Sequence, residues 1–184
     1  MTRLLLATGN AHKAQEVQHI LGTAFEIEAR DTGADETGTT FEENALIKAR
    51  ALCVQAGDRA VADDSGIEID HLDGGPGIHS ARWTGEGDWI IRVLGLLQGV
   101  GSEGRGCRYV CAAAAVWPDG REVVVRGVVE GRIVDAPRGE GGFGYDPIVA
   151  PVEGDGRTFA EMTPDDKHAI SHRSRAFREL LPRL

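Results

Sequence analysis

The sequence has few cysteines and no apolar run that predicts a signal peptide or a membrane span. Its three cysteines, Cys53, Cys107 and Cys111, form no C-x-x-C pair and no zinc-ligand spacing. This odd, scattered set predicts buried free thiols in a reducing compartment rather than a disulfide framework. The apolar stretch at residues 4–7 is too short to span or enter a membrane and is typical of a first strand. We therefore expect a cytoplasmic protein without membrane contact.

Basic residues are in the minority. There are 20 Lys and Arg against 29 Asp and Glu, and the formal net charge is −9. Broad binding to nucleic acid or to an anionic membrane needs an extended basic surface, so this balance argues against both. A small anionic ligand remains compatible with it, because screening limits exposed charges to a reach of about 8 Å and a few local cations then suffice.

Nothing divides the 184 residues into separate domains, since the chain has no repeat, no low-complexity tract and no long linker. This length fits a single domain, residues 1–184, with one or two lobes. No Walker A loop is present. The segment 139–144 satisfies G-x-G-x-x-G, but a dinucleotide loop should open a helix, and Asp146 precedes Pro147, which disfavours helical angles at Asp146.

Strand and helix patterns alternate along the chain. Residues 4–7 predict a buried strand, and apolar positions at helical spacing predict a helix through Leu21, a second over 41–56 and a third after Asp88. Residues 109–116 and 122–129 predict a hairpin around Pro118-Asp119-Gly120. Residues 145–149 predict a last strand, and Ser171 predicts the start of a terminal helix. The expected class is α/β with a mixed sheet.

The most informative segment is Asp63-Asp64-Ser65-Gly66, which follows an apolar strand. We expect the strand to end here, which would place hard oxygen ligands at a sheet edge, where a divalent cation and a phosphate can be held. Successive side chains of a strand point to opposite faces, so the two aspartates have different roles. The alternative is an ordinary polar exit from a strand into a turn.

The turn after the first strand has the parts of a phosphate site. Gly9 allows close approach of the backbone, the amides of a following helix face the ligand, and Lys13 adds a charge. A strand, turn and helix with a lysine is also a common structural unit. Further along, Thr40 and Glu43 match a helix capping box, so Glu43 is either a cap or a carboxylate that reaches a metal beside Asp64.

Two C-terminal segments predict contacts to a base. Phe143 can stack on it and Asp146 can accept from its donors, if the glycine-rich loop is more than a surface loop. Lys167, His172 and Arg173 lie within seven residues, and such cations bind phosphate or the carbonyl edge of a base, or else form a solvated face.

Taken together, six blocks resemble the inosine/xanthosine triphosphate pyrophosphatase family in order and spacing. The blocks are Thr8-Gly9-Asn10 with Lys13 and the segments 40–45, 62–66, 76–82, 141–147 and 171–173. Any one block is a weak signal, whereas six in order, from near residue 4 to near residue 181, cover almost the whole chain.

The resemblance implies a homodimeric, Mg²⁺-dependent hydrolase that converts ITP, dITP and XTP to the monophosphate and pyrophosphate, and so keeps deaminated purines out of DNA and RNA. It also implies a two-lobed α/β fold with a long twisted mixed sheet flanked by helices, and a nucleotide cleft between the lobes.

By matching position, the resemblance implies roles for individual residues. Asp64 would be the catalytic carboxylate and a metal ligand, and Glu43 a second carboxylate near the metal, which leaves capping and metal binding equally open for it. The substrate-binding residues would be Thr8, Gly9, Asn10, Ala11, His12, Lys13, Ser65, Phe143, Gly144, Tyr145, Asp146, Lys167, His172 and Arg173.

A mechanism and its alternatives follow from these assignments. A carboxylate would deprotonate water for attack on the α-phosphorus, and Lys13 would stabilise the pyrophosphate leaving group. Donors matched to a 6-keto purine would reject adenine, whereas guanine has to be rejected at its 2-position. The alternatives are a related pyrophosphatase for modified pyrimidine or methylated nucleotides, and a module that binds triphosphates without cleaving them.

Overall fold

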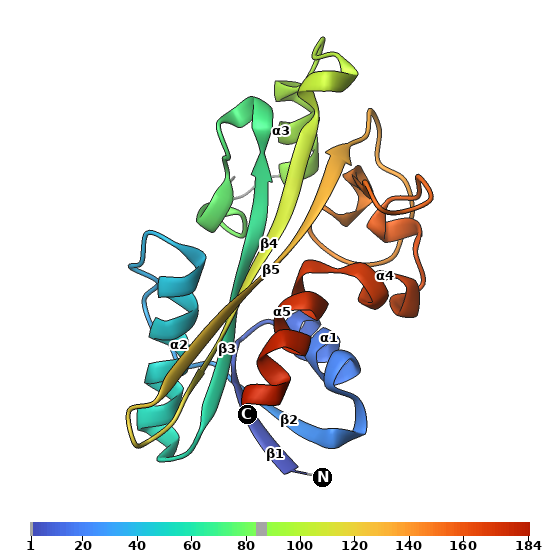
Figure 1. The fold of residues 1–184 in the computed structure, drawn as a ribbon. Coiled ribbons are helices and arrows are strands. Elements are labelled where there is room, and N and C mark those ends of the chain that lie inside the picture. Colours follow the sequence, from blue (N-terminus) through green and yellow to red (C-terminus); the bar gives the residue numbers. More distant parts are fainter. Residues whose placement is uncertain (1, 84–87) are drawn as a thin grey trace. The chain divides into compact units, whose positions relative to one another are not determined.

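A computed structural model describes residues 2–83 and 88–184 and shows a mixed six-stranded sheet flanked by helices (Figure 1). The spatial order is β2-β1-β3-β4-β5-β6. β1 pairs in parallel with β2 and β3, and β5 pairs antiparallel with β6, so the predicted α/β class with a mixed sheet is confirmed. The strands are β1 (Thr2–Ala7), β2 (Phe25–Arg30), β3 (Ala60–Ile69), β4 (Gly106–Val116), β5 (Glu122–Ile133) and β6 (Val149–Pro151).

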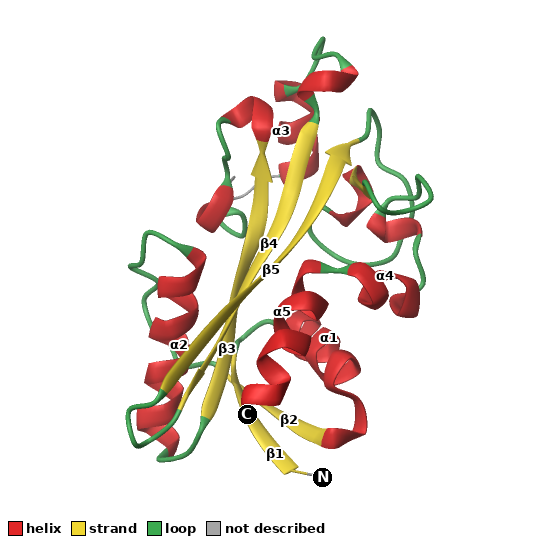
Figure 2. Ribbon diagram, in the orientation of Figure 1, coloured by secondary structure: helices red, strands yellow, loops and turns green. Residues whose placement is uncertain are grey.

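The α-helices are α1 (Ala11–Leu21), α2 (Phe41–Ala56), α3 (Trp89–Leu96), α4 (Pro164–Ile170) and α5 (His172–Leu180), shown in red in Figure 2. Their ends follow local chemistry. Asn10, Thr40 and Asp88 cap α1, α2 and α3 through side-chain oxygens that accept from backbone amides of the first turn. Gly57 ends α2 in the left-handed conformation, with φ of 64°. None of the helices in the described ranges is long and apolar enough to cross a bilayer.

The chain folds into two compact units, each assembled from separate stretches. The first unit comprises Met1–Asp64, Cys111–Gly127 and His172–Leu184, and the second comprises Ser65–Val110 and Val128–Ser171. The boundaries fall inside β3, β4 and β5, so these three strands contribute residues to both units.

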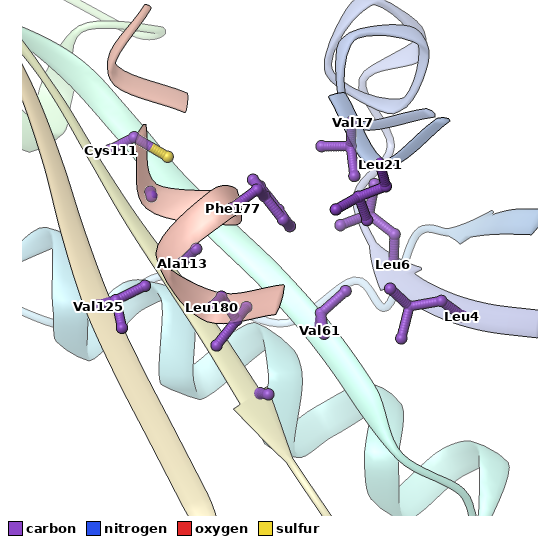
Figure 3. Packing of buried hydrophobic residues seen from close by; sticks show 12 residues of the cluster. Leu4, Leu6, Val17, Leu21, Val61, Cys111, Ala113, Val125, Phe177 and Leu180 are labelled. Carbon is purple, nitrogen blue, oxygen red and sulfur yellow. The ribbon is translucent and has the colours of Figure 1, made fainter. Parts of the chain in front are cut away.

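The first unit has its own hydrophobic core, in which α1 and α5 pack with the sheet. Figure 3 shows Val17 and Leu21 of α1 beside Leu6 of β1, with Phe177 of α5 nearby. Phe177 is fully buried, so α5 turns an apolar face toward this core. The other buried members are Leu4, Val61, Cys111, Ala113, Ala115, Val125, Ala176 and Leu180.

The second unit buries a separate and more aromatic cluster. Tyr109 and Phe159 contact each other with ring centroids 5.6 Å apart, and Tyr145 lies 5.9 Å from Trp89. The Tyr145 hydroxyl donates to the carbonyl oxygen of Ser80 at 2.9 Å, which satisfies its polar end inside the core. Aliphatic residues of β3, α3 and β5 complete the cluster.

Several predicted elements are confirmed. The strand at residues 4–7, the helices at 11–21 and 41–56 and the helix after Asp88 are all present. β4 and β5 are neighbours joined by a tight turn, in which the Trp117 amide donates to Arg121 and the Gly120 amide donates to Trp117. The terminal helix begins at His172, directly after Ser171, as expected.

Other expectations are wrong. β3 does not end at Asp63-Asp64 but continues to Ile69, because both sides of this segment are buried and its backbone stays in the central part of the sheet. The strand predicted over 145–149 is absent: a 3₁₀ turn spans Asp146–Ile148, where Pro147 lacks an amide donor, and the strand begins only at Val149. β2 and α4 were not anticipated from the sequence.

Candidate active site

β3 brings two carboxylates side by side within the first unit. Asp63 and Asp64 are consecutive, and their side chains contact different partners. Asp63 pairs with Lys13 and Arg173, whereas Asp64 contacts Asn44 and Lys48 of α2. The strand alternation therefore divides the two acids between separate clusters, as the sequence predicts.

Asp63 is the centre of a buried ionic cluster. Its Oδ2 lies 3.2 Å from Lys13 Nζ and accepts from Nη2 and Nε of Arg173 at 3.2 and 3.3 Å. Nη1 of the same guanidinium donates to Glu16 of α1. Burial alone would raise the pKa of Asp63, but the charges of Lys13, Arg173 and Lys48 outweigh it and lower this pKa well below the usual range. Asp63 is therefore ionised at neutral pH.

Asp64 lies in a second cluster, which contains a cation shared by two acids. Its Oδ2 accepts from Asn44 Nδ2 at 3.2 Å, and its Oδ1 lies 3.4 Å from Lys48 Nζ, which also donates to Glu36 Oε1 at 2.6 Å. Burial is the largest influence on Asp64 and raises its pKa; Lys48 and Lys13 lower it in part, and Glu36 adds to the rise. The raised pKa makes the Asp64 carboxylate a stronger base than an aspartate in water.

Glu36 was missed by the sequence reasoning. It lies in the polar segment before α2 and comes to the site through Lys48, whose side chain is only 13% exposed. Burial lowers the pKa of Lys48, but Asp64, Asp63 and Glu36 together raise this pKa above its usual value, so the Lys48 side chain is protonated at neutral pH. A signal was available in the sequence: Lys48 lies on the buried side of a helix, where a lysine needs an acidic partner.

Glu43 makes helix-cap contacts. Its amide donates to Thr40 Oγ1 at 3.1 Å, which is one of the two hydrogen bonds of the predicted capping box, whereas its carboxylate accepts from the amide and hydroxyl of Thr39, at 2.6 and 3.0 Å. The Thr39 hydrogen bonds lower the pKa of Glu43. The cap is therefore formed, and the assignment of Glu43 as a metal ligand stays a prediction.

The turn between β1 and α1 has the predicted strand-turn-helix geometry. Thr8 Oγ1 accepts from the Asn10 amide at 3.1 Å, and Asn10 Oδ1 accepts from the amides of His12 and Lys13 at 2.9 and 3.2 Å. A Cβ at Gly9 would lie 2.8 Å from Oδ2 of the exposed Asp31 side chain, so a larger residue here would displace that side chain. Asn10 thus holds two of the helix amides that the sequence assigned to phosphate, and Ala11 is the first residue of the helix.

The second unit holds a compact cluster at the glycine-rich loop. Asp146 Oδ2 accepts from Lys167 Nζ at 2.6 Å and from the Phe143 amide at 2.8 Å, and Asp146 Oδ1 accepts from the Tyr109 hydroxyl at 3.2 Å. Lys167 Nζ also lies 5.0 Å from the centre of the Phe143 ring. Gly142 has φ of 69° and no room for a Cβ, which would lie 2.1 Å from Asp146.

The remaining predicted residues divide between the units. Ser65, half buried on β3, belongs to the second unit, as do Gly144, Tyr145 and Lys167. His172 and Arg173 begin α5 and belong to the first unit, where both are buried. Of the three predicted C-terminal cations, Lys167 thus belongs to one unit and His172 and Arg173 to the other, and Arg173 contacts Asp63.

Comparisons with known proteins match nearly the whole chain, including the residues of the site. The Ham1 family profile matches residues 4–183. The chain is 52% identical to a dITP/XTP pyrophosphatase of Symbiobacterium thermophilum, over 99% of this chain and 94% of that relative. It is 50% identical to a dITP/XTP pyrophosphatase of Streptomyces coelicolor, over 99% and 96% of the two chains.

Solved structures of related proteins also align with nearly the whole chain. A nucleoside-triphosphatase / dITP/XTP pyrophosphatase from Mycobacterium abscessus aligns with a TM-score of 0.77 and 43% identity, over 98% of this chain and 100% of that one. A HAM1 protein from Coxiella burnetii aligns with a TM-score of 0.84 and 38% identity, over 98% and 96%. Both alignments extend over the stretches that form the two units.

Proposed function

Because the chain belongs to the Ham1 family, we propose that it is a nucleoside triphosphate pyrophosphatase that cleaves ITP, dITP and XTP to the monophosphate and pyrophosphate. The names of relatives with about half of their residues identical support this activity. The observation that carries the proposal is the buried Asp64 in the first unit, with Lys48 and Glu36 against it and the Lys13 cluster on the adjacent residue of the strand.

The donor set around Asp64 fits a divalent cation. Asp64 and Glu36 already share one cation, the Lys48 ammonium, and both are hard oxygen ligands. The described ranges contain no group of three or more His, Cys, Asp or Glu side chains placed to hold a metal. Mg²⁺ suits a pair of carboxylates, because it keeps several of its water ligands. We assign Asp64 and Glu36 as its ligands, with Glu43 as a further candidate, and the bound ion would neutralise phosphate oxygens.

Asp64 is the proposed general base. Its carboxylate would take a proton from the water that attacks the α-phosphorus. Lys13, at the first turn of α1, would stabilise the negative charge that develops on the pyrophosphate leaving group. Residues 8–12 would bind the phosphates beside it through the backbone and side chains of the turn.

The cluster of the second unit is the proposed reader of the base. Phe143 would offer a ring for stacking, and Lys167, held by Asp146, would offer its ammonium as a donor to the 6-keto oxygen of a deaminated purine. Adenine presents an amino group at that position, which would set a donor against the lysine donor, and such a mismatch can discriminate by orders of magnitude. Ser65, Gly144, Tyr145 and His172 complete the proposed substrate contacts.

We further propose that both units act as one catalytic domain, in a homodimer located in the cytoplasm, on free nucleotides. The net charge of −9 supports a free nucleotide over nucleic acid as substrate.

Release of pyrophosphate from ITP, dITP, XTP, ATP and GTP, with and without Mg²⁺, tests the activity. The expected result is rapid release from ITP, dITP and XTP only when Mg²⁺ is present, and slow release from ATP and GTP. Saturable binding of ITP with Mg²⁺ and no pyrophosphate would instead indicate a triphosphate sensor. Cleavage confined to modified pyrimidine or methylated nucleotides would reassign the substrate class.

A further inference from the structure

The Lys48 ammonium lies between the two acids that the proposed function assigns to the metal ion. Its Nζ lies 2.6 Å from Glu36 Oε1 and 3.4 Å from Asp64 Oδ1. The side chains of Glu36 and Asp64 are only 19% and 8% exposed. Acids with so little contact to water need a cation, and in the free protein the chain supplies one from its own helix α2.

We propose that Lys48 competes with the metal ion for Glu36 and Asp64: its ammonium pairs with both acids in the free protein and has to leave them before Mg²⁺ can bind. The free protein therefore binds the ion weakly, and the ion enters with the nucleotide. This inference rests on the proposed function, since it takes Glu36 and Asp64 as the metal ligands.

The ammonium and a divalent cation exclude each other at this position. Both seek the same carboxylate oxygens, and two cations beside one buried carboxylate repel each other strongly, because little water screens them. Glu36, Asp64 and Lys48 together leave a single net negative charge, which is too little to hold a divalent cation beside the ammonium. The neighbouring acid, Asp63, already faces Lys13 and does not make up the difference.

Asp64 has a second partner in α2, so it keeps its place when Lys48 leaves. Asn44 Nδ2 donates to Asp64 Oδ2 at 3.2 Å. The Gly38 amide donates to Asn44 Oδ1 at 2.9 Å, which fixes the orientation of the asparagine amide. The oxygen of Asp64 that faces Lys48 is Oδ1, and this is the oxygen that the ion would take over.

Lys48 can make this exchange because its charge lies at the end of a flexible four-carbon stem. An ammonium that gives up two buried acids needs another anion nearby. A triphosphate brings that negative charge together with its own Mg²⁺, whereas the ion alone brings none. The exchange is therefore favourable with nucleotide and unfavourable without it.

The test measures binding of Mn²⁺, which shares the preference of Mg²⁺ for oxygen ligands, to the full-length protein without nucleotide. Lys48→Met removes the charge and keeps a side chain of similar length, whereas Lys48→Arg keeps the charge. Arg50→Met is the matched control, because Arg50 lies in the same helix and pairs with Glu122 at the surface. Calorimetry gives the Kd of each protein for Mn²⁺.

We expect Lys48→Met to bind Mn²⁺ at least about 10-fold more tightly than the unaltered protein, because measured couplings between close charges reach this size. Lys48→Arg and Arg50→Met should bind it as weakly as the unaltered protein does. Adding Glu36→Gln to Lys48→Met should abolish the gain, because it removes one of the two proposed ligands.

Crystals of the unaltered protein test the exchange without any substitution, and so cover the case in which Lys48→Met does not fold. They are soaked in Mn²⁺ at a concentration above the Kd. The anomalous signal of the ion should lie between the carboxylates of Glu36 and Asp64, with Lys48 Nζ turned away from both.

Equal Mn²⁺ affinity of Lys48→Met and the unaltered protein would overturn the proposal. So would an ion bound only at other residues, or one bound beside a Lys48 ammonium that keeps both contacts. The proposed function fails separately, if the unaltered protein releases no pyrophosphate from any nucleotide. The titrations contain no nucleotide, so in that case they still decide whether Lys48 competes with the ion.

Discussion

Replacing Asp146 by asparagine removes one buried charge and leaves another behind. In the second unit Lys167 Nζ lies 2.6 Å from Asp146 Oδ2, and the two side chains are 7% and 5% exposed. An amide oxygen can still accept from the Phe143 amide, and the Tyr109 hydroxyl can reverse its hydrogen bond. The charge of Lys167 then loses the carboxylate that lies 2.6 Å from it. Breaking one side of a buried ion pair costs about 3–5 kcal/mol in free energy of unfolding.

Urea unfolding followed by circular dichroism measures this loss. The matched control is Asp166→Asn, in the same helix as Lys167, because Asp166 pairs with Arg157 at the surface, where both side chains are more than 40% exposed. An exposed pair contributes at most about 1 kcal/mol. If Asp146→Asn destabilises the protein no more than this control does, the Lys167 ammonium is solvated or neutral, and the proposed reading of a 6-keto group by a fixed cation is wrong.

Three further outcomes are expected. Asp64→Asn should lower kcat for ITP by about 10³-fold, and ordinary turnover would refute the role of Asp64 as base. The free energy of unfolding at pH 7 should not fall, because burial raises the pKa of Asp64 and the ionised carboxylate therefore disfavours the folded state. Folding lowers the pKa of Asp63, because nearby cations outweigh the effect of burial, so the stability that ionised Asp63 contributes is lost as pH falls below 3.8, the usual pKa of this side chain. In Asp63→Asn, the free energy of unfolding, measured by urea titration, should therefore fall less steeply in acid. An unchanged pH profile would contradict the ion pairs. Gly142→Ala should lower kcat/KM for ITP, because a Cβ at this position would lie 2.1 Å from Asp146. The control is Gly156→Ala, which should leave kcat/KM unchanged, because Gly156 also has a positive φ, of 90°, but has open space around it. Equal kinetics of the two variants would show that the glycine-rich loop around Gly142 is not part of the site.

Local signals in the sequence predicted much of the fold. Asn10, Thr40 and Asp88 mark helix starts because their side chains satisfy amides within a few residues, so no distant contact is needed. The turn containing Gly120 is equally local. Helix α4 was missed because its seven residues carry only a weak periodic pattern, although Thr163 caps it and Pro164 begins it.

The site was harder to predict, because its partners are far apart in sequence. The residue types at Lys13, Asp64 and Lys167 are recognisable from their motifs. The pairing of Arg173 with Asp63 joins residues 110 positions apart, and nothing in either motif indicates it. The path of β3 through Asp63-Asp64 was also missed, since polar residues inside a strand suggest an exit until their buried partners are known.

The discontinuous make-up of the first unit has a consequence for biosynthesis. β1 and α1 of this unit are synthesised before the second unit, yet the core of the first unit includes Phe177 and Leu180, and its buried guanidinium is supplied by Arg173. A nascent chain that has reached residue 171 therefore contains every residue of the second unit and lacks the helix that completes the first. The residues of the first unit up to Asp64 must wait for residues 172–184 to complete their core, and until then Asp63 lacks the contact with Arg173.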